Sequence, residues 1–172
     1  SHEGNFNYLC KGKKTMDILG TRNWVEIING PNLQRIGRRE PEIYGTKTME
    51  ACLEELRTTY SESLRITYFQ SHSEGALIER LYQLEDEGVD GIILNAGAYT
   101  HTSLALADAL RAISIPTIEV HISNIYAREE IRRHSLLSPV CQGVITGLGL
   151  DSYRLAIEAL QSRLHAQSPY EP

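Results

Sequence analysis

The sequence is poor in cysteine and lysine, and both shortages exclude classes of protein. Its three cysteines are odd in number and scattered, at positions 10, 52 and 141, so they predict no disulfide framework and favour a reducing compartment. Of the four lysines, three lie near the N-terminus, at 11, 13 and 14. Because the fourth, Lys47, stands at a predicted helix start, we do not expect catalysis through a lysine Schiff base.

Long apolar runs and a basic balance are also missing. No run approaches the roughly 20 residues that a transmembrane helix needs, and no secretory signal is recognisable. The formal net charge of −5 argues against nucleic-acid binding, which requires a basic surface. We therefore expect a cytoplasmic protein that binds neither nucleic acid nor membrane.

Sequence motifs of several enzyme classes are absent as well. There is no Walker sequence and no Gly-x-Ser-x-Gly elbow. The segment 147–152 has two glycines of a dinucleotide fingerprint but lacks the third, and it follows the last predicted strand. We interpret it as a tight turn into the final helix.

What the chain does contain is a regular alternation of predicted strands and helices. Short β-rich runs predict strands at 24–28, 64–69, 91–94, 117–120 and 143–146. Helical periodicity predicts a helix capped by Thr48, a second opened by the capping-box spacing of Ser71 and Glu74, and further helices at 102–113, 127–134 and 150–165. The pattern predicts an α/β fold, a flavodoxin-like three-layer sandwich whose five-stranded parallel sheet has the order 2-1-3-4-5.

One catalytic domain is expected, over residues 23–168. Residues 1–22 are polar and lack apolar periodicity, and their Ser-His start is typical of a cloning remnant. We treat them as an N-terminal tail, tag-derived or disordered, and residues 169–172 as a C-terminal tail.

Polar residues follow the predicted strands repeatedly. They are Asn29 and Asn32 after the first strand, Ser71 and His72 after the second, Asn95 after the third, and His121 and Ser123 after the fourth. Ligands of open parallel sheets bind outside the carboxyl ends of the strands, near the point where the strand order reverses. The sequence therefore predicts the site at this edge.

Glu119 and His121 form the sharpest pair at that edge. Two residues apart on a strand, they point to the same side, so the carboxylate can orient the imidazole as a general acid or base. Metal binding by Glu119, His121 and His101 is an alternative, although no HxH or HExxH spacing accompanies them. The backbone amides of Ile122 and Ser123 can receive a carboxylate.

Two groups of arginines flank the predicted site. Arg35, Arg38 and Arg39 lie in a loop rich in glycine and proline that ends near Tyr44, and Arg128, Arg132 and Arg133 lie in the predicted helix 127–134. Each group alone is compatible with an ordinary solvated surface, but together they favour recognition of an anion. An adjacent arginine can lower the pKa of a tyrosine by roughly 1–3 units and make its phenolate a usable base.

Taken together, these segments resemble type II 3-dehydroquinate dehydratase. The resemblance runs from about Trp24 to about Leu164. It rests on four motifs in the same order and spacing, at 29–45 (NGPNL, then GRREPEIYG), 70–75 (QSHSEG), 95–103 (NAGAYTHTS) and 119–135 (EVHISN, then AREE and RRHS).

The resemblance implies a cofactor-free and metal-free anti elimination of water from 3-dehydroquinate through an enolate. It gives catalytic roles to Tyr44 as base, Arg39 and Arg128 beside it, Asn32 at the enolate, and His121 oriented by Glu119 as acid. It implies substrate binding by Asn95, His101, Arg132 and the amides of Ile122 and Ser123. It also implies a homo-oligomer, a dodecamer of four trimers, in which Asp108 reaches a neighbouring subunit's site.

Two other functions remain open at this point. One is a flavodoxin-like module that binds a nucleotide or flavin without chemistry of its own, and the other is a metal-dependent lyase.

Overall fold

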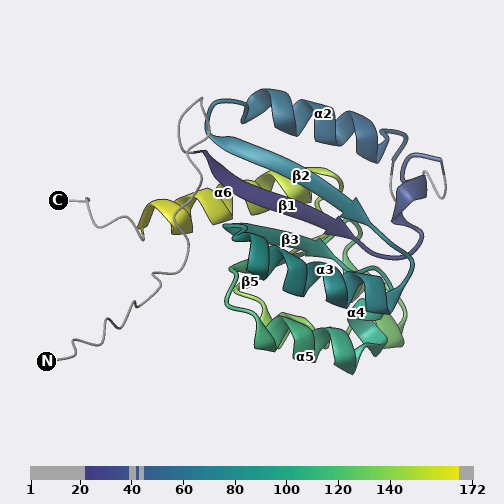
Figure 1. The fold of residues 1–172 in the computed structure, drawn as a ribbon. Helices are drawn as coiled ribbons and strands as arrows, with labels where there is room; N and C mark the ends of the chain where they lie inside the picture. Colours follow the sequence, from purple (N-terminus) through teal and green to yellow (C-terminus); the bar gives the residue numbers. More distant parts are fainter. Residues whose placement is uncertain (1–21, 39–41, 43–44, 167–172) are drawn as a thin grey trace, which may run out of the picture.

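The computed structural model describes residues 22–38, 42 and 45–166. Its five strands are β1 (Asn23–Asn29), β2 (Leu64–Gln70), β3 (Gly91–Asn95), β4 (Thr117–His121) and β5 (Gly143–Thr146). All neighbouring strands are parallel, and their order is β2-β1-β3-β4-β5 (Figure 1). The predicted fold class and strand order are confirmed. None of the described helices combines the length and the hydrophobicity that a membrane-spanning helix requires.

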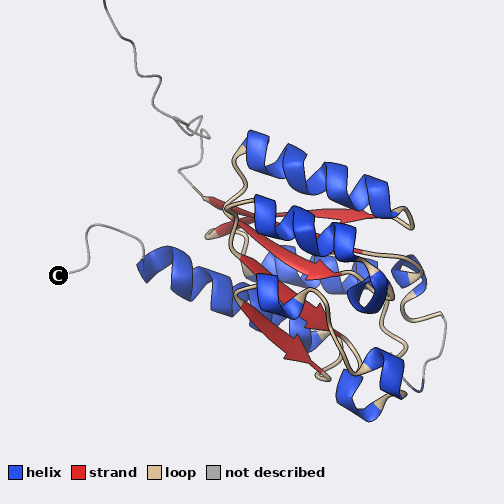
Figure 2. Ribbon diagram, turned by 90° about the horizontal axis from the view of Figure 1, so that it is seen from below, coloured by secondary structure: helices blue, strands red, loops and turns tan. Residues whose placement is uncertain are grey.

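Four long helices cover the two faces of the sheet (Figure 2). The helices α2 (Met49–Thr59) and α6 (Asp151–Ala166) pack on one face, and α3 (Glu74–Glu87) and α5 (Leu104–Ala112) pack on the other. Shorter turns are the helix α4 (Tyr99–Thr102) and the 3-10 helices η1 (Leu33–Arg35), η2 (Ile125–Ala127), η3 (Glu130–Arg132) and η4 (Ser138–Val140).

The central strand β3 explains how one sheet supports two hydrophobic cores. Ile92, Ile93 and Leu94 are all fully buried. Because side chains alternate along a strand, Ile93 packs into the core beneath α2 and α6, whereas Ile92 and Leu94 pack into the core beneath α3 and α5. The continuous apolar run in the sequence reflects this coverage on both faces.

The predicted helix 102–113 is wrong at its start. Ser103 has extended backbone angles (φ −98°, ψ 96°) and separates α4 from α5. Its buried hydroxyl accepts a hydrogen bond from the N–H of Leu106, so this serine caps a new helix rather than continuing one.

The predicted capping box is also wrong. The N-cap of α3 is Ser73, whose hydroxyl accepts from the N–H of Ala76. Ser71 instead accepts from the N–H of Ser73, two residues along, because β2 still extends to Gln70 and the chain must turn before the helix begins.

The predicted helix 127–134 does not form. Arg128 and Glu129 have extended backbone angles, and only the 3-10 turns η2 and η3 flank them. The segment has no apolar face to bury, since Ile131 is 67% exposed, so packing supplies nothing to hold a helix together. Arg128 and Arg132 are therefore not paired along one helical face as the sequence suggested.

The ends of β1 and β3 meet at close range. The register aligns Asn29 with Asn95, and the N–H of Gly30 donates to the carbonyl of Asn95 at 2.7 Å. A Cβ atom on Gly30 would lie only 2.4 Å from the carbonyl oxygen of Ala96. Only glycine therefore fits where β1 ends, and this contact joins the two strands at the reversal point of the sheet.

Replacing Gly30 by alanine is expected to destabilise the fold. Because the new methyl group meets backbone atoms that cannot move aside cheaply, we expect a loss of about 1–3 kcal/mol in the free energy of unfolding, measured by urea denaturation. Gly75→Ala is the matched control, since its Cβ would meet nothing closer than 3.8 Å. In α3 that change should be neutral or stabilising, by up to about 1 kcal/mol. Equal stabilities of the two variants would contradict the close-approach argument.

Candidate active site

A cleft of about 190 Å³ lies at the carboxyl edge of the sheet. It is lined by the last residues of β3 and β4 and by residues that follow β1, β3 and β4, namely Pro31, Asn32, Leu33, Arg35, Ile36, Asn95, Gly97, Ala98, His101, His121, Ile122, Ser123, Ile125, Arg128 and Arg132. Three arginines and no carboxylate belong to this set of described residues. The cleft is therefore electropositive and suits an anionic ligand.

Glu119 and His121 lie together at the end of β4, as predicted. Oε2 of Glu119 is 3.1 Å from Nε2 of His121, and both side chains are buried. Nε2 of His121 makes no hydrogen bond in this arrangement. The contact is therefore mainly electrostatic, and it becomes strongest when the imidazole is protonated.

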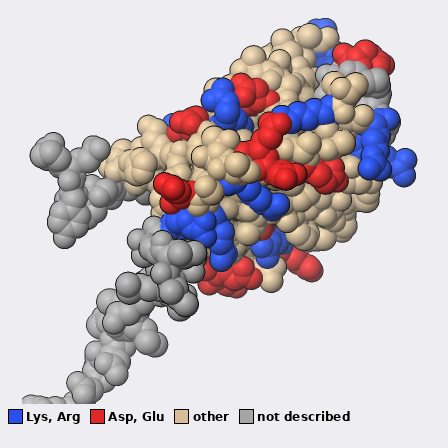
Figure 3. Space-filling view, turned by 90° about the horizontal axis from the view of Figure 1, so that it is seen from above, with Lys and Arg blue, Asp and Glu red and all other residues tan. Residues whose placement is uncertain are grey.

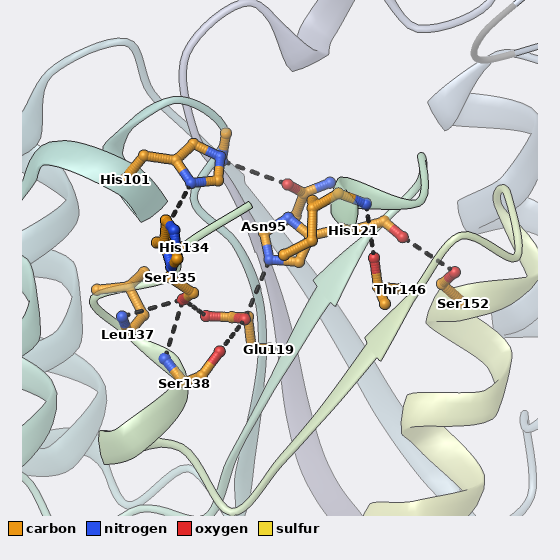
Figure 4. A network of polar contacts seen from close by, with 12 residues as sticks. Asn95, His101, Glu119, His121, His134, Ser135, Leu137, Ser138, Thr146 and Ser152 are labelled. Carbon is orange, nitrogen blue, oxygen red and sulfur yellow. Dashed lines mark hydrogen bonds and ion pairs between the residues drawn. The ribbon is translucent and has the colours of Figure 1, made fainter. Parts of the chain in front are cut away.

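Two serines hold Glu119 from the other side (Figure 4). The hydroxyl of Ser135 donates to Oε1 at 2.6 Å, and that of Ser138 donates to Oε2 at 2.7 Å. Burial alone would raise the pKa of the Glu119 carboxyl, but His121, Ser135 and Ser138 outweigh it and hold that pKa below its usual value. Glu119 is therefore a buried carboxylate anchored behind His121.

His101 lies beside His121 at the mouth of the cleft. The two rings are stacked, with centroids 6.3 Å apart, and Nδ1 of His101 lies 2.7 Å from the carbonyl of His134. Burial lowers the pKa of His101, and the nearby His121 and Arg132 lower it further. This histidine is suited to hydrogen bonding as a neutral group.

Asn32 stands in a left-handed conformation (φ 68°) directly after β1. Its backbone N–H donates to Nδ1 of His72 at 3.1 Å, and the Tyr99 hydroxyl donates to the carbonyl of His72. The turns after β1, β2 and β3 are thereby connected through one histidine. Asparagine tolerates this backbone region better than most residues, so Asn32 can occupy the strained position.

The turn after β5 holds the end of β4. The N–H groups of Gly147 and Gly149 donate to the carbonyls of His121 and Ile122 at 3.1 and 3.0 Å. Both glycines have positive φ, which confirms the tight turn expected at 147–152. Among the hydrogen bonds of the described residues, none uses the amides of Ile122 or Ser123, so both can receive an oxygen of a ligand.

Glu129 organises the two arginines that were predicted to share a helix. Its carboxylate lies 2.5 Å from Nε of Arg132 and 3.6 Å from Nε of Arg128. Arg128 also donates to the hydroxyl of Ser123 at 3.2 Å. Both arginines line the cleft although the predicted helix is absent.

The structure brings together most of the predicted site residues, and Glu119 stands behind them. Asn32, Asn95, His101, His121, Ile122, Ser123, Arg128 and Arg132 line the cleft. Asp108 does not; its side chain is 74% exposed on α5 and pairs with Arg111. Arg39 and Tyr44 lie outside the described residues.

Sequence reasoning gave no individual role to Ser135, Ser138 or Arg35. The two serines follow no strand end, and nothing in their spacing announces that they contact Glu119. Arg35 was noticed only as one of a group of arginines, and its place in the cleft depends on the turn η1.

The residues of the alternative metal site, Glu119, His121 and His101, have other partners. Glu119 is saturated by side-chain contacts, and within the described part of the chain no three His, Cys, Asp or Glu residues form a potential metal site.

On the face that carries α2, acidic and basic side chains are interspersed rather than gathered into a basic patch (Figure 3).

Comparisons with known proteins agree with this geometry. Residues 23–161 match the family model described as dehydroquinase class II. The chain is 55% identical over 137 residues to a 3-dehydroquinate dehydratase of Pelodictyon phaeoclathratiforme, covering 79% of this chain and 90% of the relative. It is 50% identical over 137 residues to that of Bacillus pumilus, covering 79% and 92%.

Solved structures give the same result. A type II dehydroquinase from Butyrivibrio crossotus superposes with a TM-score of 0.80 at 43% identity, over 83% of this chain and 99% of that one. A second, from Propionibacterium acnes, superposes with a TM-score of 0.77 at 41% identity, over 83% and 99%.

The serine contacts to Glu119 make a prediction about acid stability. A carboxyl whose pKa is depressed in the native state contributes stability above its unfolded pKa, and this contribution is lost as the pH falls through the folded pKa. Ser138→Ala removes one donor, so the folded pKa rises and the contribution shrinks. We expect a loss of about 1–3 kcal/mol at neutral pH and acid unfolding that begins at a higher pH, followed by circular dichroism.

The matched control is Ser162→Ala on the exposed side of α6. It should leave both the stability and the acid midpoint within error of the parent protein. An acid midpoint of Ser138→Ala that equals that of the control would show that the hydroxyl does not stabilise the carboxylate.

Proposed function

Because the chain belongs to the class II dehydroquinase family and is a hydro-lyase of the 3-dehydroquinate dehydratase type, we propose that it removes water from 3-dehydroquinate by an anti elimination through an enolate. The product is 3-dehydroshikimate. The single observation that carries this route is the buried Glu119–His121 pair at the edge of an electropositive cleft. It provides an oriented proton donor beside a site suited to a carboxylate substrate.

The acid half of the reaction is assigned to His121. Since Nε2 faces Glu119 at 3.1 Å, Nδ1 is the nitrogen that can give its proton to the departing hydroxyl. The anchored carboxylate holds the imidazole ring at the end of β4, so that the proton donor is oriented before the transfer. When the carbon–oxygen bond breaks, that proton and the hydroxyl leave together as water.

The base half is assigned to Tyr44 with Arg39, which lie outside the described residues. A tyrosine has a pKa near 10, and a neighbouring guanidinium can lower it by roughly 1–3 units. The phenolate would then take the proton from the carbon beside the ketone and leave the enolate. Arg128, which lines the cleft, adds to the positive field that favours both the phenolate and the enolate.

Asn32 is assigned the stabilisation of the enolate oxygen. A hydrogen bond to His72 holds the backbone of Asn32, and this residue lines the cleft. The side-chain amide of Asn32, or a water bound to that amide, is therefore oriented before the reaction. Stabilisation of a developing oxyanion by preorganised donors is often the largest contribution to such catalysis.

The remaining cleft residues are assigned to substrate binding. Asn95, His101 and Arg132 would hold the ring hydroxyls, and the free amides of Ile122 and Ser123 would receive the carboxylate. Every group in this scheme is supplied by the chain itself, so we propose that no metal or cofactor takes part.

Asp108 is assigned to a neighbouring subunit. Its exposure on α5, away from the cleft of its own chain, supports a role in another copy's site. We propose a homo-oligomer, a dodecamer of four trimers, as the active form.

The first test is turnover without metal. After chelation, the protein should convert 3-dehydroquinate to a product with enone absorbance, because its side chains supply the acid, the base and the oxyanion donors. Tyr44→Phe is the control and should lose at least about 100-fold in kcat, within the range for a general base. Absence of turnover in the metal-free protein would overturn the proposed function, whereas an active Tyr44→Phe would overturn only the base assignment.

The shared site can be tested by subunit complementation. Asp108→Ala and His121→Ala should each be impaired, but co-refolding them in equal amounts creates sites that draw His121 from one chain and Asp108 from its neighbour. Random mixing should restore about one quarter of the wild-type activity.

The control mixture combines His121→Ala with Asn95→Ala. Both residues line the cleft of their own chain, so this mixture should not recover. Equal recovery in the two mixtures, or none in either, would contradict a contribution of Asp108 to a neighbour.

A further inference from the structure

A chain of four polar side chains lies beneath the cleft, and only one of them enters it. Tyr68 on β2, Asn29 on β1, Tyr153 on α6 and Asn95 on β3 are joined by successive hydrogen bonds of 3.3, 2.7 and 3.0 Å. Asn29 and Tyr153 are fully buried, and Asn95 is 3% exposed at the cleft wall. These hydrogen bonds thus connect the final helix to a residue that lines the cleft.

The orientation of Asn95 is set by a backbone donor. Its Oδ1 accepts from the N–H of Gly97 at 3.3 Å. Because a backbone N–H can only donate, Oδ1 must face Gly97, and Nδ2 must face the hydroxyl of Tyr153. Gly97 has a positive φ (58°), and a Cβ atom on it would lie 3.2 Å from the carbonyl oxygen of Pro31, so this turn favours glycine.

That orientation determines the direction of every other hydrogen bond in the chain. Since Tyr153 accepts from Asn95, its single proton goes to Oδ1 of Asn29. Nδ2 of Asn29 then donates to the hydroxyl of Tyr68. Each group has the complementary partner that its position requires, so no alternative set of directions satisfies the Gly97 contact.

Tyr153 is suited to this position because it remains a neutral phenol. Its burial raises the pKa of the hydroxyl, and this effect outweighs the hydrogen bonds from Asn95 and to Asn29. The oxygen therefore acts at once as acceptor and donor over the whole working pH range. Phenylalanine would preserve the packing of α6 but leave Nδ2 of Asn95 and Oδ1 of Asn29 without partners.

We infer that Tyr153 is a positioning residue, which holds the Asn95 amide so that its second Nδ2–H points into the cleft as a donor to a substrate hydroxyl. This inference rests on the proposed function for the identity of the substrate. It assigns a role in substrate binding to a side chain on α6 that is itself fully buried.

The test compares two variants that each remove one phenolic hydroxyl from this series of hydrogen bonds. In Tyr153→Phe, Asn95 loses the partner that holds it, so KM for 3-dehydroquinate should rise about 3- to 10-fold with a smaller change in kcat. In Tyr68→Phe, Asn29 loses a partner but the Asn95, Gly97 and Tyr153 contacts remain, so KM should stay within error of wild type.

A double-mutant cycle separates positioning from a general structural effect. If Tyr153 acts through Asn95, Tyr153→Phe should raise KM in the parent protein and leave it unchanged in an Asn95→Ala background. Equal KM increases in the two backgrounds, or equal increases in Tyr153→Phe and Tyr68→Phe, would overturn the inference. Thermal unfolding of each variant verifies that the folded enzyme is being measured.

Asn29→Ala is the alternative if Tyr153→Phe does not fold. It keeps the Tyr153 hydroxyl but removes the acceptor of its proton, so the hydroxyl is no longer held in line with Nδ2 of Asn95 and KM should still rise. An unchanged KM in that variant would also overturn the inference. Because wild-type turnover is measured alongside, failure of the proposed function would be recognised separately, as an inactive parent protein.

Discussion

The close meeting of β1 and β3 at their carboxyl ends is the constraint on which the site depends. Gly30 lies against the backbone of Ala96, and its N–H is bonded to the carbonyl of Asn95. This contact aligns the turn that carries Asn32 with the turn that carries Gly97 and His101, at the point where the strand order reverses. The cleft exists because these two turns diverge from one shared edge.

A second constraint is the cost of burying charge beside that edge. An unpaired carboxylate in the interior would be protonated or would destabilise the fold, since desolvation strongly disfavours the charged form. Glu119 avoids this because two serine hydroxyls and the His121 ring surround it. Ser135 lies between η3 and η4 and Ser138 begins η4, so a stretch of short 3-10 turns stabilises the carboxylate that contacts His121.

Burial of apolar side chains also explains which elements of the fold and site could be predicted from the sequence and which could not. Alternation of apolar runs and helical periods predicted the sheet and its order, because burial on two faces leaves a strong local pattern. Strand-end polar residues such as Asn32, Asn95 and His121 were found because the ends of parallel strands share an edge. The predicted helix 127–134 was wrong because its charges have the spacing of a helix but lack an apolar face.

The sequence by itself determined the fold class, the family resemblance and the residue types at the carboxyl edge, since these follow from local pattern and motif. Only the tertiary structure decided that Ser135 and Ser138 anchor Glu119, that His72 holds the backbone of Asn32, and that Tyr153 reaches Asn95. Such contacts join residues distant in the chain. Their hydrogen-bond directions depend on which partners the packed helices and turns bring within about 3 Å, and sequence spacing does not encode that.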